Sequence, residues 1–327
     1  MTRALIVGCG RIAGGYNESD ETRALSHVVA LRRAGAEIVG CVDRDAMRAR
    51  TFATRWKIAD HHVDLVESLT RLKPDLVVDC TPPNARYAVT SAALAASSVR
   101  VVIAEKPLGR TSAEASALGA LIRATDKPVI IGYQRAFDPC YIEAEVLVRR
   151  GALGHINRVA AIAYGGALAN MSHMLERVFA MVGSPIEAAL ISAPIYEDDN
   201  DPGLSFRATF GGDVEGSFLA VPRAGPALIE LDLIGSEGRL RILDSECRVE
   251  LSRALPSADG VARPMEPATQ TNIPRPDDEA ICHIANAAIA AAREPVHDMR
   301  LLERAVDAVV VIDSLRRTGA YAQKNAA

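Results

Sequence analysis

The stretch LIVGCGRIAGG, residues 5–15, leads from a short apolar strand directly into a glycine-rich turn. Gly8 and Gly10 occupy the first two positions of the G-x-G-x-x-G/A pattern of dinucleotide-binding turns, and Ala13 occupies the third. The first glycine permits the tight turn, the second lets the backbone approach a pyrophosphate, and the third small residue allows close helix–strand packing. Glycine also occurs in turns that bind nothing, but the position after the first strand favours a dinucleotide site. The pyrophosphate would rest on the N-terminus of the following helix.

The first 132 residues alternate strand-like and helix-like segments. Four more short apolar runs follow the first strand: EIVGCVD, DLVVDCT, VRVVIAE and KPVIIGY. Runs of this kind are typical of parallel strands covered on both faces, and helical patterns such as SHVVALRRAG and SAEASALGALIRAT lie between them. The alternation predicts an α/β Rossmann domain, a doubly wound parallel sheet that binds a dinucleotide, over residues 1–132.

The remainder of the chain has a different pattern. Strand-like runs such as HINRVAAIAYG, LSFRATFGG and ALIELDLIGSEG are separated by Gly, Pro and Asp turns, which indicates antiparallel strands. Helices are expected at MLERVFAMVG and at DMRLLERAVDAVVVIDSLRRTG. We therefore predict, over residues 133–327, an α+β domain for substrate binding and oligomerisation with a large open, mainly antiparallel sheet.

Composition and charge exclude several classes of protein. The 327-residue chain is 49% hydrophobic and 24% charged, the balance of an ordinary soluble globular protein, and its formal net charge of -4 gives no basis for binding nucleic acid or an anionic membrane. The six cysteines contain no CxxC pair and the histidines show no metal-ligand spacing, so we expect neither a metal site nor a disulfide framework. With no signal peptide before the first strand and no apolar run of membrane-spanning length, the expected location is cytoplasmic.

The run EIVGCVD ends in Asp43, whose carboxylate can accept hydrogen bonds from the hydroxyls of an adenosine ribose. Asp43 lies farther from the glycines than the usual spacing of about 20 residues, and the stretch YNESDETRALSH resembles an extra loop that causes the difference. Asp43 could also cap the helix that follows it, and both roles can hold at once. The neighbouring Arg44 could meet a 2′-phosphate, so NAD(H) is favoured and NADP(H) stays possible.

The motif DCTPPNARY, residues 79–87, closes another strand of the predicted sheet. Pro82 and Pro83 stop the strand sharply, and Asn84 can begin the next helix. In an open parallel sheet, ligands bind at this carboxyl edge of the strands. The residues that we expect to bind the cofactor from this edge are Gly8, Gly10, Arg11, Ile12, Asp43, Arg44, Thr81, Pro82 and Asn84.

The apolar run VVIA, residues 101–104, ends in Glu105, Lys106 and Pro107 at the same edge. A charge directly after a buried strand is costly unless it serves a cleft or is paired. Pro107 keeps Lys106 extended, and side chains alternate along a strand, so Glu105 and Lys106 should point to opposite sides and not neutralise each other. A lysine beside a bound nicotinamide would have its pKa lowered by the positive ring and by burial, which suits acid–base work near neutral pH.

Together these motifs resemble the Gfo/Idh/MocA family, the relatives of glucose-fructose oxidoreductase and inositol dehydrogenase. GCGRIA resembles the dinucleotide loop of the family, CTPPNARY its fourth-strand motif, and EKPLG its hallmark, while GYQRAFDPCY, GALGHINRV, LIGSEGRLRI and VVIDSLRRTG resemble segments of its second domain. The resemblance covers nearly the whole chain and implies that Lys106 is the principal catalytic residue. It also implies that Glu105 contacts the nicotinamide side of the cofactor, so Glu105 and Lys106 complete the expected cofactor-binding residues. It further implies that the open sheet mediates dimers.

SHMLERVFAMVG resembles the helix that carries the catalytic histidine of the family, which would here be His173. The family commonly has an aspartate four residues before this histidine, where this chain has Ala169, or Asn170 if one residue is deleted. Neither side chain is a carboxylate, so a Lys–Asp–His relay cannot be assumed. Without the resemblance, His173 would be interpreted as a histidine that caps or packs inside a helix.

The expected function is that of an NAD(P)-dependent oxidoreductase, which transfers hydride between nicotinamide and a secondary alcohol or ketone of a sugar, cyclitol or nucleotide-sugar. Lys106 would donate or accept the proton of the substrate oxygen. The alternatives are an imine or enone reductase of the same fold and a non-catalytic NAD(P)-binding regulator. The expected substrate-binding residues are Lys106, Tyr133, Arg135, Asn170 and His173.

Two features of this set stay open in the sequence. Tyr133 and Arg135 could equally form an interdomain hydrogen bond or salt bridge, and the identity of the substrate depends on second-domain side chains that only folding brings together. An open sheet with an uncovered apolar face further predicts a homodimer or a homotetramer built from dimers.

Overall fold

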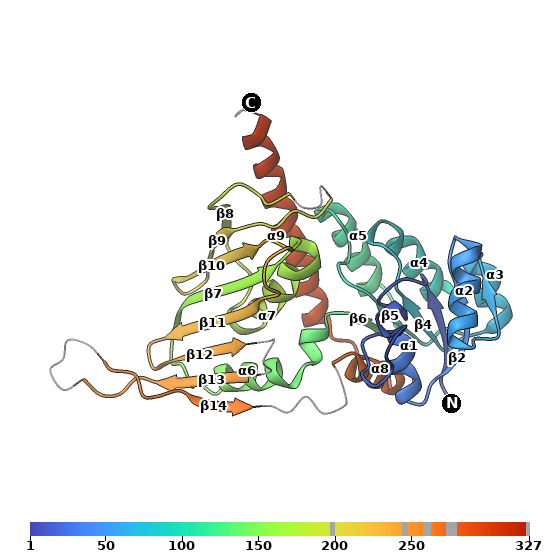
Figure 1. The fold of residues 1–327 in the computed structure, drawn as a ribbon, viewed down its shortest axis with the longest axis horizontal. Coiled ribbons are helices and arrows are strands. Elements are labelled where there is room, and N and C mark those ends of the chain that lie inside the picture. Colours follow the sequence, from blue (N-terminus) through green and yellow to red (C-terminus); the bar gives the residue numbers. More distant parts are fainter. Residues whose placement is uncertain (197–199, 244–247, 258–262, 273–279, 325–327) are drawn as a thin grey trace. The chain divides into compact units, whose positions relative to one another are not determined.

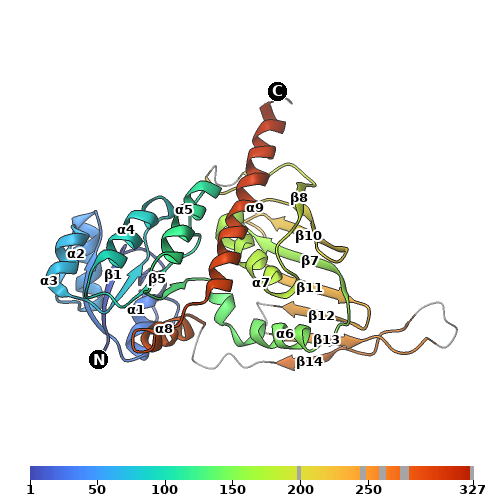
Figure 2. The ribbon, with the colours of Figure 1, turned by 180° about the vertical axis from the view of Figure 1, so that it is seen from behind.

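The chain folds into two compact units, which are shown from opposite sides in Figure 1 and Figure 2. The first unit comprises Met1–Phe137 and Pro276–Val306, and the second comprises Asp138–Arg275 and Asp307–Ala327. None of the described helices is both long enough and apolar enough to cross a membrane. The structure is a computed structural model that describes residues 1–196, 200–243, 248–257, 263–272 and 280–324.

A six-stranded parallel sheet with the order β3-β2-β1-β4-β5-β6 forms the centre of the first unit (Figure 1). The order reverses between β1 and β4, which pair from Ala4 opposite Leu76 to Val7 opposite Asp79. Strands β4 and β5 are buried along their whole length, as the apolar runs predict. The predicted Rossmann fold is confirmed, and its strands are β1 (Arg3–Val7), β2 (Glu37–Val42), β3 (His61–His62), β4 (Leu76–Asp79), β5 (Val101–Ala104) and β6 (Val129–Ile131).

Helices cover both faces of this sheet (Figure 2). One face is covered by α1 (His27–Arg33), α2 (Ala46–Trp56) and α8 (Ala280–Ala291), which share one buried apolar cluster with the strands. The crossover helices of the later strands pack on the other face: α3 (Leu65–Leu72), α4 (Pro83–Ala95) and α5 (Ser112–Arg123). Because these crossovers leave the first face without a helix over β5 and β6, α8 from late in the chain packs there.

Sequence patterns do not indicate α8, because its segment AICHIANAAIAA has polar side chains only at His283 and Asn286 and therefore no polar stripe. Ile281, Ile284 and Ala288 of this helix are almost completely buried. The first unit thus includes residues from far beyond position 132, where the sequence places its end.

An eight-stranded sheet with the order β14-β13-β12-β11-β7-β10-β9-β8 forms the second unit (Figure 1). Neighbouring strands are antiparallel except β7 and β10, which pair in parallel from Arg158 opposite Glu215 to Tyr164 opposite Val221. The predicted, mainly antiparallel sheet is confirmed. Its strands are β7 (Ile156–Tyr164), β8 (Glu187–Leu190), β9 (Phe206–Phe210), β10 (Val214–Val221), β11 (Ile229–Gly235), β12 (Gly238–Leu243), β13 (Arg248–Arg253) and β14 (Thr269–Asn272).

Helices α6 (Pro139–Arg149) and α7 (Ser172–Val182) pack against one face of this sheet, and the later part of α9 (Met299–Lys324) belongs to the same unit (Figure 2). Phe179 of α7 meets Phe210 of β9 edge to face, with ring centroids 6.4 Å apart. A buried arginine of α7, Arg177, lies 3.3 Å from a carboxylate oxygen of Glu145 on α6 and fixes the two helices to each other. The helix face of the sheet is therefore a well-packed core.

The open face of the same sheet is rich in charged side chains. Arg158 lies 3.6 Å from Glu215, and ion pairs also join Arg239 to Asp232 and Arg241 to Glu250. Leu219 and Ile234, which the strand register places on this face, are 42% and 41% exposed. The prediction of a large exposed apolar face is thus wrong, because strand alternation sends apolar residues such as Val214 and Phe218 to the helix side and leaves Leu219 and Ile234 among charged side chains.

Candidate active site

The glycine-rich turn after β1 brings the backbone close to the end of β4. Gly8 has a φ of +89°, and its amide donates to the carbonyl of Val42 at 2.7 Å. A Cβ atom at Gly8 would lie 2.9 Å from the carbonyl carbon of Cys80, so conformation and space both require glycine. Gly10 faces open space, because a Cβ atom there would meet nothing within 4 Å. This is the room that a pyrophosphate needs to approach the main chain.

A short helical turn follows the glycines. The amide of Tyr16 donates to the carbonyl of Arg11, and a 3-10 turn spans Gly15–Asn17. Within the part of the chain that the structure describes, no acceptor is bonded to the amides of residues 10–13. These N–H groups at the start of a helical turn can receive an anion.

Helix α1 begins only at His27, well after this turn. Its first two amides, those of His27 and Val28, donate to the carbonyls of Ile12 and Ala13. The sequence predicts a pyrophosphate on the N-terminus of the helix after the glycines, and this stays a prediction. Because the amides of His27 and Val28 are already bonded, the amides of residues 10–13 are the better candidates to receive the anion.

Asn17 holds the loop between this turn and α1 and is completely buried. Its side-chain nitrogen donates to the carbonyls of Asp20 and Arg23, each at 2.6 Å. Its side-chain oxygen accepts from the amide of Leu25 and the hydroxyl of Ser26. The extra loop that the sequence predicts is confirmed, and its hydrogen bonds fix where α1 starts.

Asp43 lies buried at the end of β2 and holds the glycine-rich turn in place. Its Oδ2 accepts from the amide of Cys9 at 2.9 Å, and its Oδ1 accepts from the amide of Asp45 at 3.0 Å. Helix α2 is capped by Asp45, whose Oδ1 accepts from the amides of Met47 and Arg48. The alternative role of Asp43 as a helix cap is therefore wrong. A carboxylate has about four acceptor positions, so two remain for ribose hydroxyls.

A cavity of about 240 Å³ opens beside Asp43 at the carboxyl edge of the sheet. It brings together most of the residues predicted to bind the cofactor, from the ends of three strands. Arg48 also lines it, with its Nη1 3.7 Å from Oδ2 of Asp43. The predicted residues that line this cavity are Gly8, Asp43, Arg44, Thr81, Pro82 and Asn84.

Asp79, at the end of β4, organises the turn that carries Thr81. Its Oδ1 accepts from the amide of Thr81 and its Oδ2 from the hydroxyl of Thr90, each at 3.0 Å. Burial raises the pKa of Asp79, and the positive charge of Arg86 and the threonine hydrogen bonds oppose that rise. Arg86 is itself 2% exposed and donates to the carbonyls of Thr81 and Pro107. It thereby links the turn after β4 to the turn after β5.

Lys106 is half-buried directly after β5, and its peptide bond to Pro107 is cis. Its amide donates to Oε2 of Glu105 at 3.2 Å. The other carboxylate oxygen of Glu105, Oε1, lies 2.8 Å from Nε2 of His27 in α1. Both oxygens of Glu105 are thus bonded within the protein, and both Glu105 and His27 are buried.

The charge of Glu105 is set by its neighbours. Burial alone would raise the pKa of Glu105, but the hydrogen bond from His27 and the positive charges of His27, Lys106 and Arg86 bring it below its ordinary value of 4.5. Glu105 is therefore an anion at neutral pH, and Nε2 of His27 carries the proton between them. A Cβ atom at Gly132 would lie 2.7 Å from Oε1 of Glu105, so the carboxylate occupies the space that this glycine leaves.

The two candidates after β6 differ in exposure. Tyr133 is completely buried, whereas Arg135 is half-buried in the 3-10 turn Gln134–Phe137. Both belong to the first unit together with Lys106. Their roles in substrate binding stay predictions.

In the second unit, His173 stands in the first turn of α7 and is 6% exposed. A π-helical turn, Ala167–Met171, leads into this helix. Insertions of this kind inside helices occur frequently at functional sites. The side-chain nitrogen of Asn170 donates to the carbonyl of Tyr164 at 2.7 Å, which fixes the side chain that stands near the position of the family aspartate.

A carboxylate from elsewhere in the chain caps the π-helical turn. Oδ1 of Asp201 accepts from the amide of Leu168 at 2.7 Å, and Oδ2 accepts from the amide of Ala169 at 2.9 Å. A Cβ atom at Gly166 would lie 2.0 Å from Oδ2 of Asp201, so the absence of a side chain there admits the carboxylate. The sequence has no acidic residue at positions 169 and 170, but the fold brings the carboxylate of Asp201 to this segment.

Sequence reasoning did not single out four side chains that organise these sites. His27, Asp79 and Arg86 are buried polar groups of the first unit, and Asp201 belongs to the second. The only available signal was the place of Asp79 and Arg86 inside the motif DCTPPNARY. Nothing in the sequence links His27 to Glu105, because 78 positions separate them.

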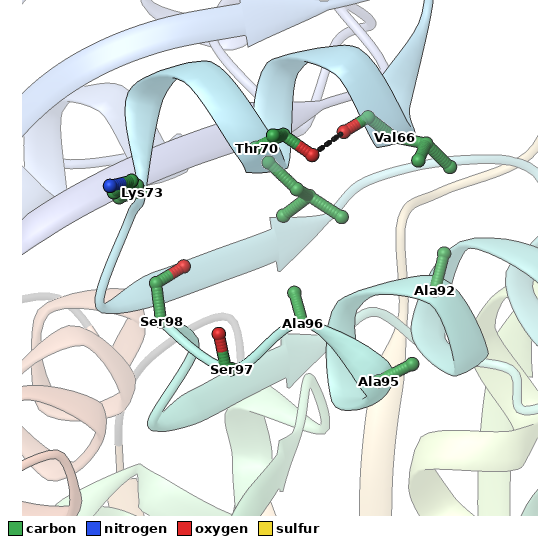
Figure 3. A pocket seen from close by; sticks show the side chains of 9 residues that line it. Val66, Thr70, Lys73, Ala92, Ala95, Ala96, Ser97 and Ser98 are labelled. Atoms are coloured by element: carbon green, nitrogen blue, oxygen red, sulfur yellow. Dashed lines mark hydrogen bonds between the residues drawn. The ribbon is translucent and has the colours of Figure 1, made fainter.

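A larger hollow of about 510 Å³ lies elsewhere on the first unit, between α3 and α4 (Figure 3). Val66, Thr70 and Lys73 line it from one side, and Ser97 and Ser98 from the segment before β5. This is the amino edge of the strands, whereas open α/β sheets bind ligands at the carboxyl edge. Among the described residues, no cluster of His, Cys, Asp or Glu is arranged to hold a metal ion. The candidate site is therefore the carboxyl edge, around Asp43 and Lys106.

Comparison with known proteins agrees with the site geometry. Residues 2–133 match the family model of the Gfo/Idh/MocA proteins, which is described as an oxidoreductase family with an NAD-binding Rossmann fold. Residues 2–133 are thus similar to the Gfo/Idh/MocA family, and this segment is less than half of the 327-residue chain. The match includes the glycine-rich turn, Asp43 and the segment from Glu105 to Pro107 that the sequence resemblance rests on.

Curated relatives of this chain include two inositol dehydrogenases. The chain is 33% identical over 150 residues to inositol 2-dehydrogenase of Acidothermus cellulolyticus, which covers 46% of this chain and 42% of that relative. It is 29% identical over 154 residues to inositol 2-dehydrogenase 1 of Saccharopolyspora erythraea, which covers 46% of this chain and 43% of that relative. The similarity thus spans less than half the length of these relatives.

Solved structures share the fold over nearly the whole chain. Levoglucosan dehydrogenase, in complex with NADH and levoglucosan, superposes with a TM-score of 0.79 at 17% identity, covering 98% of this chain and 97% of that one. A 3-ketoreductase from Actinomadura kijaniata, in complex with TDP-benzene and NADP, gives a TM-score of 0.76 at 19% identity, covering 97% of both chains. At such identities the likeness shows the fold alone, and it extends over both units of the chain.

Proposed function

We propose that the protein is an NAD(P)-dependent dehydrogenase or reductase that acts on a secondary alcohol or ketone of a sugar, cyclitol or nucleotide-sugar. The observation that carries the proposal is the carboxyl edge of the Rossmann sheet. There the open space at Gly10, the buried carboxylate of Asp43 and the fixed backbone of Lys106 follow three different strands. The family of the first domain and the named activities of its relatives support the same reaction class.

The residues present fit a nicotinamide dinucleotide. The amides of Gly10, Arg11 and Ile12 would hold the pyrophosphate, because they have no other acceptor among the described residues. Asp43 would accept the ribose hydroxyls with its remaining lone pairs. NAD(H) is favoured, because a 2′-phosphate would meet the carboxylate of Asp43, although Arg44 and Arg48 line the same cavity and keep NADP(H) possible.

When bound, the nicotinamide supplies the redox chemistry by exchanging hydride with the substrate carbon. Lys106 would take the proton from the substrate hydroxyl during oxidation or return it to the ketone oxygen during reduction. Its positive charge would also stabilise the negative charge that develops on that oxygen. Glu105 would act by fixing the main chain of Lys106, since both its oxygens are bonded within the protein.

His173 is proposed as a second residue that hydrogen-bonds the substrate, with Asn170, Tyr133 and Arg135 as further binding residues. The π-helical turn capped by Asp201 supports this role for the segment around His173, because it orders the main chain that leads into α7. A proton relay through a neighbouring carboxylate is not part of the proposal, because the side chains at positions 169 and 170 do not titrate.

We further propose a homodimer or a tetramer of dimers formed through the open sheet. The support is that Leu219 and Ile234 are exposed on this face, which lets them pack against a partner. The charged side chains around them are already paired with one another in ion pairs. A cytoplasmic location is part of the same proposal, because Cys9, Cys41, Cys80, Cys140 and Cys282 are free thiols, as expected in a reducing compartment. Cys247 lies outside the described residues.

The experiment that tests the function is a turnover assay with the purified protein. NADH formation would be followed with a panel of cyclitols, monosaccharides and anhydrosugars, and NADH consumption with the corresponding ketones. The proposal expects turnover with at least one member and none with the cofactor alone. Tight NADH binding without turnover of any polyol, ketone, imine or enone would favour the non-catalytic regulator and overturn the enzyme.

A further inference from the structure

The main chain around Lys106 is held on both sides by buried charged groups. On one side, the amide of Lys106 donates to Oε2 of Glu105 at 3.2 Å. On the other, Arg86 donates to the carbonyl of Pro107, the next residue. Lys106 itself is half-buried directly after β5, and these two contacts hold the main chain from which its side chain leaves.

The carboxylate of Glu105 is in turn held by α1. Nε2 of His27 lies 2.8 Å from Oε1 of Glu105, and Gly132 leaves the space that the carboxylate fills. His27 is completely buried, and Glu105 is 5% exposed. With its pKa held down, the carboxylate is ionised and requires a donor, which the imidazole provides.

The histidine at position 27 is a costly choice for a core position. Its Nδ1 is buried and has no hydrogen-bond partner among the described residues, so the ring leaves one polar atom unsatisfied. An apolar side chain in this first turn of α1, beside the buried Val28 and Val29, would avoid that cost. The hydrogen bond of the ring is made to the carboxylate of Glu105, so we take holding that carboxylate to be the role of His27.

We propose that His27 is a positioning residue for Lys106, and that it acts through Glu105. The imidazole fixes the carboxylate, the carboxylate fixes the amide of Lys106, and the ammonium is thereby aimed at the substrate oxygen. This inference rests on the proposed function, in which Lys106 handles the proton of that oxygen. A proton-transfer group that is displaced by about 1 Å can lose on the order of 100-fold in rate, so small changes in this chain of contacts have measurable effects.

Two substitutions of matched polarity separate positioning from packing. In His27→Gln the amide nitrogen reaches the place of Nε2 and can still donate to Glu105. In His27→Asn the side chain is one methylene shorter and cannot reach it. The control His283→Asn removes a histidine of the same unit, on α8, that makes no hydrogen bond to Glu105 among the described residues.

Steady-state kinetics and NADH titration give the first readout. We expect His27→Asn to lower kcat by about 10-fold or more, with KM and the Kd for NADH changed less than about 3-fold, because binding groups stay in place. His27→Gln should recover most of kcat, and His283→Asn should match the wild type. Equal kcat in His27→Asn and wild type, or an equal loss in the Gln and Asn variants, would overturn the inference.

Hydrogen exchange gives a readout that needs no turnover. The amide of Lys106 should exchange faster in His27→Asn than in wild type, and at the wild-type rate in His27→Gln, because only the former frees Glu105. If the wild type turns over no substrate, the proposed function fails while this measurement still decides whether His27 fixes Lys106. If His27→Asn does not fold, His27→Leu provides the variant without a donor. Unchanged exchange at Lys106 in a folded variant without the donor contradicts the proposal.

Discussion

His27 and Glu105 form a buried pair in which Nε2 lies 2.8 Å from Oε1, and they join the first helix of the Rossmann domain to the end of its fifth strand. Glu105 directly precedes Lys106, the candidate acid–base group, and accepts a hydrogen bond from its main-chain amide. A buried carboxylate is tolerated in a core only when hydrogen bonds satisfy it, and removing its partner leaves the charge uncompensated.

The first prediction concerns the pH dependence of this pair. The pKa of Glu105 is lowered in the folded state, so its ionisation stabilises the protein above its ordinary pKa of 4.5, and that stabilisation is lost as the pH falls through the lower folded value. Glu105→Gln removes this effect. We expect the difference in the free energy of unfolding between wild type and Glu105→Gln to be larger at neutral pH than below pH 4.5. Urea denaturation at both pH values measures it, and a difference that grows on acidification would contradict an ionised Glu105 in the folded protein.

The second prediction concerns the acid–base group. Lys106→Met keeps the length and the apolar stem of the side chain but removes its charge and its proton. Turnover should fall by about 100-fold or more, while NADH binding changes little, because the glycine-rich turn and Asp43 are untouched. Steady-state kinetics with a substrate found in the turnover assay provide the test. His173→Ala should cost less than Lys106→Met, and near-normal turnover in Lys106→Met would remove its assignment.

The third prediction concerns the choice of cofactor. Asp43→Asn retains an oxygen that can accept from the amide of Cys9 but loses the negative charge beside the ribose site. The ratio of the Kd for NADPH to that for NADH should be above one in wild type and should decrease in this variant, because repulsion of the 2′-phosphate is relieved. Asp45→Asn is the matched control, since Asp45 caps α2 and does not line the cavity. A wild-type preference for NADPH would instead show that Arg44 and Arg48 decide.

The fourth prediction concerns the cap of the π-helical turn. Asp201→Ala removes the acceptor of two main-chain amides, those of Leu168 and Ala169. Loss of a capping side chain costs about 0.5–2 kcal/mol, so the second unit should unfold at lower urea concentration. Asp201→Asn keeps one acceptor oxygen, so its stability to urea should lie between those of the wild type and Asp201→Ala. If the alanine variant were as stable as wild type, the cap would contribute nothing to the order of the segment before His173.

How much of this arrangement the sequence predicts depends on how far apart the partners lie along the chain. Gly8, Asp43 and Thr81 follow strands directly, and parallel strands end at one edge, so their convergence around one cavity follows from the pattern. The placement of Lys106 at the same edge follows from the same rule. Residues that reach their partners through the fold give no local pattern, which is why His27 and Asp201 were not predicted.

Two differences between expectation and structure have definite physical causes. A helix was expected to follow the glycines directly, but the loop held by Asn17 delays α1 until His27 and leaves the amides of residues 10–13 without an acceptor among the described residues. The open sheet was expected to be apolar, but the alternation of its strands puts Arg158, Asp232 and Arg239 on that face. A local stretch of sequence does not reveal which hydrogen bonds hold a loop. It also does not reveal which face of a sheet the helices cover.

The fifth prediction concerns α8. Ile284 is completely buried against the Rossmann sheet, so Ile284→Ala should destabilise the first unit by about 2–5 kcal/mol. Val296→Ala, at a side chain that is 65% exposed, is the control and should change stability by less than about 0.5 kcal/mol. Urea denaturation of both variants compares them. Equal stability of Ile284→Ala and wild type would show that α8 is not part of this core.

The return of α8 to the Rossmann sheet has a consequence for synthesis on the ribosome. The dinucleotide-binding unit begins at the first residue, yet one of the helices that cover its sheet is made only when residues 280–291 emerge. Domains usually fold in order as they leave the ribosome. Here the nascent N-terminal unit has to wait, with the apolar surface over β5 and β6 uncovered, until nearly nine tenths of the 327 residues have been translated. A chain interrupted after residue 132 would carry every residue that we propose to bind the dinucleotide and still lack a closed core.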